Sequence, residues 1–189
     1  MNDFLPEGYE APETQSHYME FDEGQNAFRA LTPAVVGFEW WVEDGEGFKP
    51  NRVRTLEEVP EEFQNSPDGQ QARHFWAFAV YNYQTKSIQV LVLRQQTIMR
   101  AIEAFAKSPK WGSPLNYDLV IEKTKTGRGV RDVEYSVIPE PPSPLDPGIV
   151  ELAEQVPVRL EALFEGEDPF AVAERKAAGV KAGKARRRQ

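Results

Sequence analysis

One run of eleven residues, 73–83, constrains the fold of this chain more than any other feature. It reads Arg-His-Phe-Trp-Ala-Phe-Ala-Val-Tyr-Asn-Tyr and is rich in aromatic side chains, which favour strands. Alternate residues of a strand point to opposite faces. The run therefore predicts one face with Arg73, Phe75 and Tyr81 and another with Trp76, Phe78 and Val80. We expect Trp76 and Phe78 to fill the core and the other face to be either core or a ligand surface.

Single-stranded nucleic acid is the ligand that such a surface favours. A base stacked on an aromatic ring is worth roughly 1–3 kcal/mol, whatever the base. The alternative is a sheet that is merely rich in aromatic residues, because Phe, Tyr and Trp are ordinary strand formers. The run by itself favours that alternative, so a binding function needs further support from the rest of the chain.

Length and composition predict one folded domain with appendages. The chain has 189 residues, of which 40% are hydrophobic, enough for a single core if the ends lie outside it. The absence of cysteine excludes disulfides, thiolate metal sites and thiol nucleophiles. No apolar stretch approaches the roughly 20 residues of a membrane span, and the first residues lack the cationic start of a signal peptide. We expect no membrane partner and a cytoplasmic location.

Charge is distributed unevenly along the chain and divides it into three parts. The net charge is −8, yet residues 1–24 carry seven acids and no lysine or arginine, whereas residues 175–189 carry seven bases and no acid. A proline-rich stretch at 139–144 predicts the end of the folded domain. We therefore expect a flexible acidic N-terminal arm at 1–24, a folded domain at 25–140, and a linker, short helices and basic tail at 141–189. Asp146-Pro147 and Asp168-Pro169 are typical of helix starts.

The pattern of apolar residues predicts mostly strands and one long helix. Strands are expected at 26–31, 35–42, 52–56, 73–83, 87–93, 117–123 and 133–138, with the third of these the weakest. Ile98, Ile102 and Phe105 recur at helical spacing and predict a helix over 95–107. A polar surface excursion is expected at 57–71 and a cationic hairpin tip at 124–132. This order predicts a mainly β fold with α, an OB-fold built as a five-stranded Greek-key barrel, with an antiparallel β-sandwich as the competitor.

Several short blocks together resemble the single-stranded-DNA-binding proteins of tailed phages. The blocks are Gln-Asn-Ala-Phe-Arg-Ala-Leu (25–31), Gly-Phe-Glu-Trp-Trp (37–41), the run at 75–83, Lys-Trp-Gly (110–112), Tyr-Asp-Leu (117–119) and Glu-Tyr-Ser-Val (134–137). The resemblance covers about residues 20–142. It implies an OB-fold that coats and protects single strands during phage DNA replication, recombination or repair, without catalysis and with little sequence preference. The implied partners are single-stranded DNA, further copies of the protein along the strand, and replication or recombination proteins.

The chain departs from that family at two places. Many members end in an acidic tail that recruits partners, whereas this chain ends in Lys184-Ala185-Arg186-Arg187-Arg188, so recruitment of that kind is not implied. The last hairpin of relatives often has a threonine-glycine turn flanked by arginine. That turn is recognisable here at 125–129, but extra charged residues shift its position. We expect the basic tail either to contact phosphates or to bind the acidic arm of the next protomer, which would make binding cooperative.

The candidate binding residues are aromatic side chains and cations on the predicted strands and loops. Trp40 and Trp41 are adjacent on a strand and must point to opposite faces, so one of them is the expected stacking platform. Phe75 and Tyr81 are the next candidates. Phosphates would be neutralised by a cationic set whose release of counterions makes affinity salt-dependent. The set comprises Lys49, Arg52, Arg54, Arg73, Lys123, Lys125, Arg128 and Arg131.

An enzyme finds little support in the sequence. His17 and His74 are the only histidines, and neither has a visible catalytic partner. Phosphate-binding loops, zinc spacings and nucleophile elbows are not evident, so we expect no catalytic residues, no metal and no cofactor. The alternative function is a phage-encoded, OB-like protein-interaction module that acts on a host enzyme. Salt separates the two, because nucleic-acid binding must weaken as salt rises.

Overall fold

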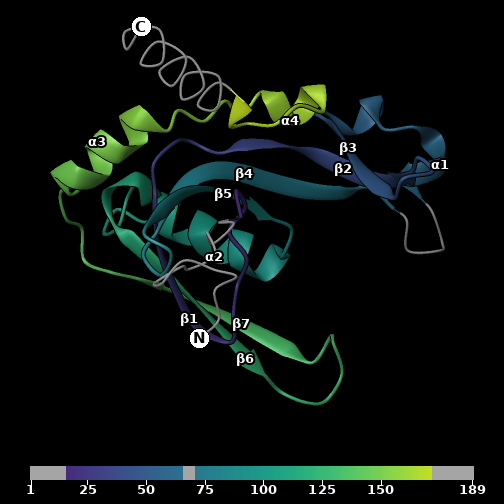
Figure 1. Cartoon of the computed structure of the whole chain (residues 1–189). Coiled ribbons are helices and arrows are strands. Elements are labelled where there is room, and N and C mark those ends of the chain that lie inside the picture. Colours follow the sequence, from purple (N-terminus) through teal and green to yellow (C-terminus); the bar gives the residue numbers. More distant parts are fainter. Residues whose placement is uncertain (1–15, 66–70, 172–189) are drawn as a thin grey trace, which may run out of the picture.

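The computed structural model describes residues 16–65 and 71–171, which form a seven-stranded antiparallel sheet with helices on both faces (Figure 1). The prediction of a mainly β fold with helices is confirmed. The strands are β1 (Gly24–Ala30), β2 (Val35–Glu43), β3 (Phe48–Val53), β4 (Arg73–Asn82), β5 (Ser87–Leu93), β6 (Asp118–Lys125) and β7 (Val133–Pro139). The helices are η1 (Leu56–Glu58), α1 (Glu61–Gln64), α2 (Gln96–Lys107), η2 (Pro114–Asn116), α3 (Pro147–Gln155) and α4 (Ala162–Glu165).

Strand β4, the aromatic run, is the centre of the sheet. One of its edges pairs with β2 and then β1, at Val35↔Ala77 and Ala30↔Val80, and its other edge pairs with β5 from Trp76 to Asn82. Between β1 and β2 the strand is interrupted at Pro33, which has no N–H to donate to a neighbouring strand. The Thr32 hydroxyl accepts a hydrogen bond from the Ala79 N–H at 3.0 Å across this break. The full order is β3-β2-β4-β1-β6-β7, with β5 on the far side of β4.

Strand β3 lies at the edge of the sheet and extends β2 into a long hairpin. We predicted a strand at 52–56, but the strand begins and ends earlier, because Gly45 and Gly47 take up positive φ values in the turn and start the pairing at Glu43↔Phe48. Pro50 is tolerated because β3 pairs only with β2, so its missing N–H faces away from the ladder. After Val53 the chain turns into η1, where the Glu58 carboxylate accepts from the Thr55 N–H at 2.8 Å.

The sheet is not closed into a barrel, and the N-terminal segment lies beside the edge of β5. The Met19 N–H donates to the Val90 carbonyl at 3.0 Å, and the Val90 N–H donates to the His17 carbonyl at 2.9 Å. Further along, Lys123 Nζ donates to the Phe21 carbonyl at 2.7 Å. We predicted an arm outside the fold at 1–24; residues 16–23 are instead held against the sheet, because they satisfy β5's edge and bury Met19. The rest of that predicted arm lies outside the described residues.

Two hydrophobic cores form, one on each face of β4, as its alternating pattern requires. On one face Phe78 and Val80 pack with Ile98 and Ile102 of α2. On the other face Phe75, Ala77 and Val90 are covered by the C-terminal segment, through residues that include Leu160, Leu163 and Phe170. Figure 1 shows α2 on one side of the sheet and α3 and α4 on the other.

The C-terminal segment was predicted to lie outside the core, and residues 147–171 instead complete it. The predicted helix start at Asp146-Pro147 is confirmed, because Asp146 caps α3 by accepting from the Gly148 N–H at 2.7 Å. Helix α4 is not the second predicted helix, since it ends at Glu165, before Asp168-Pro169. Gly37 lets α4 approach, since a Cβ there would lie 2.8 Å from an atom of the Phe164 ring. The segment packs because its apolar side chains cover the aromatic face of β4, which would otherwise be exposed to water. The predicted basic tail at 175–189 lies outside the described residues.

The excursion between β3 and β4 is anchored to the sheet in its described part. Val59 is 2% exposed, and Phe63 of α1 stacks on Trp40. Residues 66–70 lie outside the described part. No helix among residues 16–65 and 71–171 has the length and apolar character needed to cross a bilayer.

Candidate binding site

Phe75, a predicted stacking residue, has no exposed surface. Its ring lies 5.9 Å from the Phe164 ring between centroids, and the Arg52 guanidinium carbon lies 5.6 Å from the Phe75 ring centroid. A base has no access to this ring, so Phe75 leaves the candidate set. The prediction was wrong here because the C-terminal helices, not a ligand, cover this part of β4.

Tyr81 is half-buried and lies at the other end of β4. Its ring meets the Tyr83 ring edge-on, with centroids 5.1 Å apart and an interplanar angle of 87°. Both tyrosines line a cavity of about 520 Å³ beside Arg29 and Asp118. That cavity shares no lining residue with the one that contains Trp41, so the structure does not bring Tyr81 and Trp41 together.

The two adjacent tryptophans have opposite environments, as their positions in β2 require. Trp40 is 8% exposed and stacks on Phe63, with centroids 5.8 Å apart and planes 28° from parallel. Trp41 points to the other face and is 45% exposed. The structure therefore decides between the two: Trp40 is a core residue, and Trp41 is the available stacking platform.

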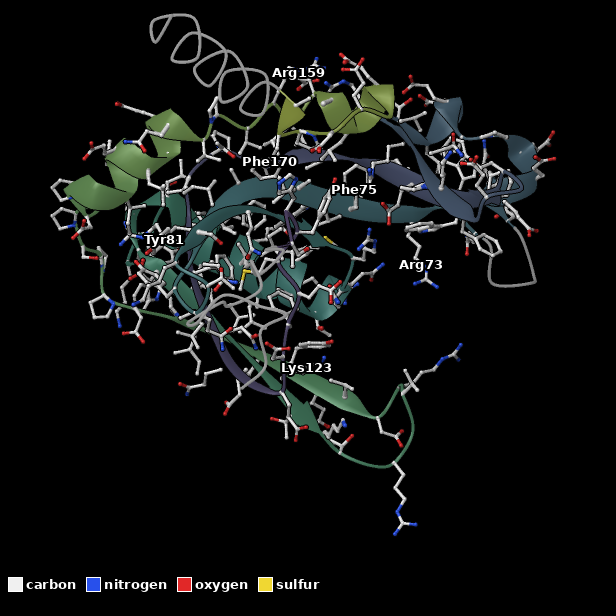
Figure 2. All side chains as sticks on the ribbon, in the orientation of Figure 1. Arg73, Phe75, Tyr81, Lys123, Arg159 and Phe170 are labelled. Carbon is white, nitrogen blue, oxygen red and sulfur yellow. The ribbon has the colours of Figure 1, made fainter. Side chains whose placement is uncertain are left out.

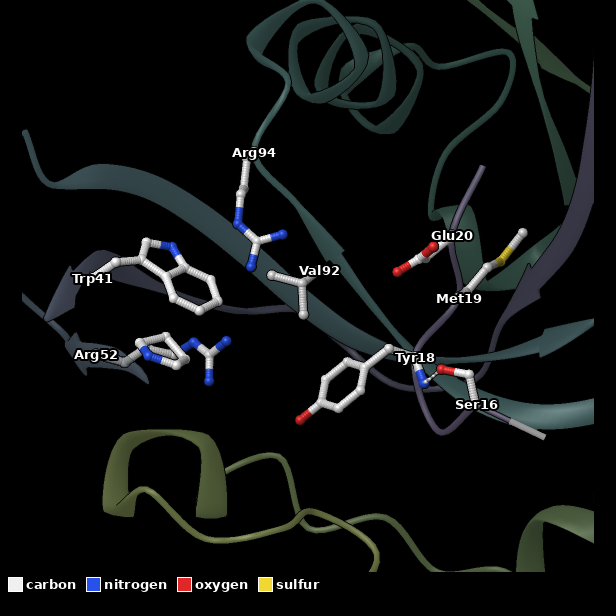
Figure 3. A pocket seen from close by; sticks show the side chains of 9 residues that line it. Ser16, Tyr18, Met19, Glu20, Trp41, Arg52, Val92 and Arg94 are labelled. Carbon is white, nitrogen blue, oxygen red and sulfur yellow. Dashed lines mark hydrogen bonds between the residues drawn. The ribbon is translucent and has the colours of Figure 1, made fainter. Parts of the chain in front are cut away.

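Trp41 lines an open cavity of about 400 Å³ that several separate segments build together. Figure 3 shows the Trp41 and Tyr18 rings and the guanidinium groups of Arg52 and Arg94 directed into the same space. Tyr18 belongs to the N-terminal segment, Arg52 to β3, and Arg94 follows β5 directly. The remaining lining residues are Ser16, Met19, Glu20, Pro50 and Val92.

A buried carboxylate holds both arginines of this pocket. Glu39 is 1% exposed; its Oε2 accepts from Arg52 Nε at 3.1 Å and from Arg94 Nη2 at 3.2 Å, while its Oε1 contacts Arg94 Nε. Two guanidinium groups thus share one carboxylate, which leaves an excess positive charge on this triad. The Glu20 carboxylate also lines the pocket and offsets that excess.

Tyr18 is a neutral hydrogen-bond donor in this pocket. Burial is the main cause that raises the pKa of its hydroxyl above the usual value, and the nearby Arg52 opposes that rise. The side chain is 37% exposed, so one part of the ring packs while another meets solvent. A half-exposed ring with a neutral hydroxyl suits stacking on a flat ligand together with a single polar contact.

Five members of the predicted cationic set have partners in the described part of the chain, and three of these are at least partly buried or hold segments of the fold together. Arg52 binds Glu39 in the pocket, as described above. Arg54 pairs with Glu161, and its guanidinium lies 4.4 Å from the Phe164 ring centroid, so it holds the C-terminal segment to β3. Lys123 is half-buried and donates to the Phe21 carbonyl. Of these three, only Arg52 lines the pocket.

The other predicted cations are exposed but lie in different places. Arg73 begins β4 and projects from it in Figure 2. Lys49 pairs with Asp44 at the β2–β3 turn, and Lys125 Nζ lies 3.9 Å from Glu23 Oε2. Arg128 and Arg131 are exposed at the tip of the β6–β7 hairpin. Figure 1 shows the β2–β3 and β6–β7 hairpins both projecting to the right of the sheet, one above the other in this view.

The sequence reasoning missed Tyr18, Glu39 and Arg94. A signal existed for Arg94, which is the first charged residue after the apolar strand at 87–93. Glu39 interrupts an otherwise apolar and aromatic strand, which is a recognisable sign of a buried, paired carboxylate. Tyr18 carried no signal, because its position depends on the pairing of residues 17–19 with Val90.

Comparison with known proteins adds no relative: no family model matches the chain, and no curated protein matches it significantly. Among residues 16–65 and 71–171, no three acidic, histidine or cysteine side chains are grouped as a metal site would need. The kind of ligand that the pocket suits is therefore inferred from its lining residues alone. It offers flat rings, two oriented guanidinium groups and a neutral hydroxyl, which suit a flat, anionic ligand.

Proposed function

We propose that the protein binds single-stranded DNA without catalysis, and that it coats and protects single strands during phage DNA replication, recombination or repair. The observation that carries the proposal is the pocket in which the exposed Trp41 and Tyr18 rings meet the Arg52 and Arg94 guanidinium groups. Rings stack on bases of any sequence, and guanidinium groups bind phosphates. This combination favours a strand with little sequence preference.

The strand order supports an OB-fold as the architecture behind this function. In that reading β1 and β2 are one long strand broken at Pro33, β4 and β5 are the second and third strands, α2 follows, and β6 and β7 are the last two. Strand β3 is an addition to the loop between the first two strands. The edges of β5 and β7 do not pair with each other, and residues 16–21 run from β5 towards β6. OB-folds bind oligonucleotides with their strand face and the loops that here correspond to the β2–β3 and β6–β7 hairpins.

The test is a fluorescence-anisotropy titration of labelled oligo-dT with the full chain at low and high salt, with duplex DNA of equal length as competitor. We expect binding that weakens as salt rises and that duplex does not displace. Trp41→Ala should weaken binding, while Leu115→Ala, which truncates an exposed side chain outside the pocket, should leave it unchanged. No binding at low salt would reject the proposal. Salt-insensitive capture of a host protein through Trp41 would instead favour the protein-interaction module.

A further inference from the structure

Phe48 is the most exposed aromatic side chain in the described part of the chain. It is 63% exposed, compared with 45% for Trp41 and 37% for Tyr18. It lies at the start of β3, next to the turn of the β2–β3 hairpin. It does not line the pocket described above and belongs to neither core.

The register of the hairpin puts Phe48 on the same face as Trp41. Directly opposed residues of an antiparallel pair share a face, and alternate residues along each strand do as well. Trp41 is opposite Pro50, and Glu43 is opposite Phe48. Phe48 therefore follows Trp41 along one face towards the hairpin turn. Val42 and Lys49, which oppose each other, lie on the reverse face.

We propose that the bound DNA strand leaves the pocket along this face and that Phe48 is a further stacking residue; this rests on the function proposed above. Phe48 is two residues from Pro50, which is the partner of Trp41. Two residues span about 7 Å along a strand. That spacing is roughly twice the rise per nucleotide of duplex DNA, so an unstacked strand can span it with one nucleotide. Tyr18, Trp41 and Phe48 thus form a ring strip that leads from the pocket to the hairpin turn.

Both positive and negative side chains lie along the ring strip, so the charge that a phosphate meets differs from one end to the other. Arg73 is opposite Glu39, so it is a diagonal neighbour of Trp41 on the same face. Glu43 is exposed beside Phe48 and repels phosphate at that end. The contact at Phe48 therefore comes from the ring more than from charge. Its contribution should survive at salt concentrations that screen exposed charges.

The experiment compares two lengths of labelled oligo-dT, about 4 and about 16 nucleotides, which bracket the site sizes of OB-folds. Phe48→Ala should weaken binding of the longer strand by about fivefold or more and change binding of the shorter one by less than about twofold. Phe48→Trp should retain wild-type affinity, whereas Phe48→Leu, which is apolar but has no flat face, should bind like Phe48→Ala. Val42→Ala, on the reverse face of the same hairpin, is the matched control and should change neither.

Trp41→Ala separates failure of this inference from failure of the proposed function. Wild-type protein that binds neither length would overturn both. Weakened binding of both lengths by Trp41→Ala, with no effect of Phe48→Ala on either, would overturn only the role of Phe48. Wild-type affinity of Phe48→Leu would also overturn it, because a stacking ring would then not be required. The urea midpoint of each variant should equal that of wild type, since these side chains are exposed.

Discussion

The Nε of Arg52 donates a hydrogen bond to the Glu39 carboxylate at 3.1 Å, in a position where Glu39 is 1% exposed and the Arg52 side chain 9%. Arg94 reaches the same carboxylate from the end of β5, and its side chain is 33% exposed. Glu39 is therefore the centre that fixes both guanidinium groups of the pocket. Because the pairs are buried to different degrees, they should differ in how much they contribute to stability.

Glu39→Gln should lower the free energy of unfolding by about 3 kcal/mol, because it leaves buried guanidinium charge without its carboxylate. Arg94→Ala should cost less, since the more exposed Arg94 is solvated by water. Urea denaturation followed by tryptophan fluorescence measures both. Glu103→Gln, which breaks an exposed pair with Lys107 on α2, is the control and should show no measurable loss. Equal losses for Glu39→Gln and Arg94→Ala would contradict this account of the pocket.

The two tryptophans should separate binding from stability. Trp41→Ala should weaken oligo-dT binding by roughly 1–3 kcal/mol and leave the urea midpoint unchanged, because the ring is exposed. Trp40→Ala should instead destabilise the fold by about 3–5 kcal/mol, since it removes a buried ring that stacks on Phe63. Anisotropy and urea denaturation of both variants check this. The reverse pattern would mean that the ligand uses the other face of β2.

Two exposed cations should respond differently to salt. Arg73 shares the face of Trp41, whereas Lys49 lies on the reverse face of the hairpin and pairs with Asp44. Arg73→Ala should reduce the slope of log affinity against log salt by about 0.7, the loss expected for one phosphate contact on a single strand. Lys49→Ala should leave the slope unchanged. Titrations at four or so salt concentrations give the slopes, and an equal reduction in both variants would argue against a single binding face.

Glu20 should limit the affinity of the pocket for an anionic strand. A carboxylate about 7 Å from a phosphate in water costs about 0.6 kcal/mol, so Glu20→Gln should strengthen oligo-dT binding by about threefold at low salt. The gain should shrink as salt rises. Glu122→Gln on β6, a residue outside the pocket, serves as the comparison. Weaker binding by Glu20→Gln would show that the carboxylate contacts the ligand directly.

Ionisation of Tyr83 should lower the stability of the fold at high pH. Burial is the main cause that raises its pKa to about 12, and its hydroxyl donates to Asp118 Oδ1 at 2.9 Å. The fold therefore favours the protonated phenol; this stability is fully present below the ordinary tyrosine pKa of about 10 and is lost as pH rises towards 12. Tyr83→Phe should flatten that fall in urea denaturation between these pH values. A smaller fall should remain, since the pKa values of Tyr18 and Tyr117 are raised as well.

Local patterns were sufficient for much of the sheet. The alternation in the aromatic run predicted the two faces of β4, with Phe78 and Val80 on the core that contacts α2. The helix at 95–107 and the hairpins at 73–93 and 117–138 were also predicted, because the signals for each lie within one continuous segment. The strand after the glycine-rich turn was misplaced by several residues, since its bounds depend on pairing with β2 rather than on its own composition.

The sequence by itself determined which residues alternate, where the chain turns, and that one of Trp40 and Trp41 must be exposed. Only the tertiary structure decided that Trp41 is the exposed one, that Phe75 is covered, and that Tyr18 and Arg94 meet at the pocket. The physical reason is the separation along the chain of the residues whose interactions decide each feature. Periodicity follows from backbone geometry within a segment, whereas burial of Phe75 and placement of Tyr18 depend on segments that lie far from β4 and β2 in the chain. Such packing is set by the summed apolar contacts of the whole fold, and no short pattern encodes it.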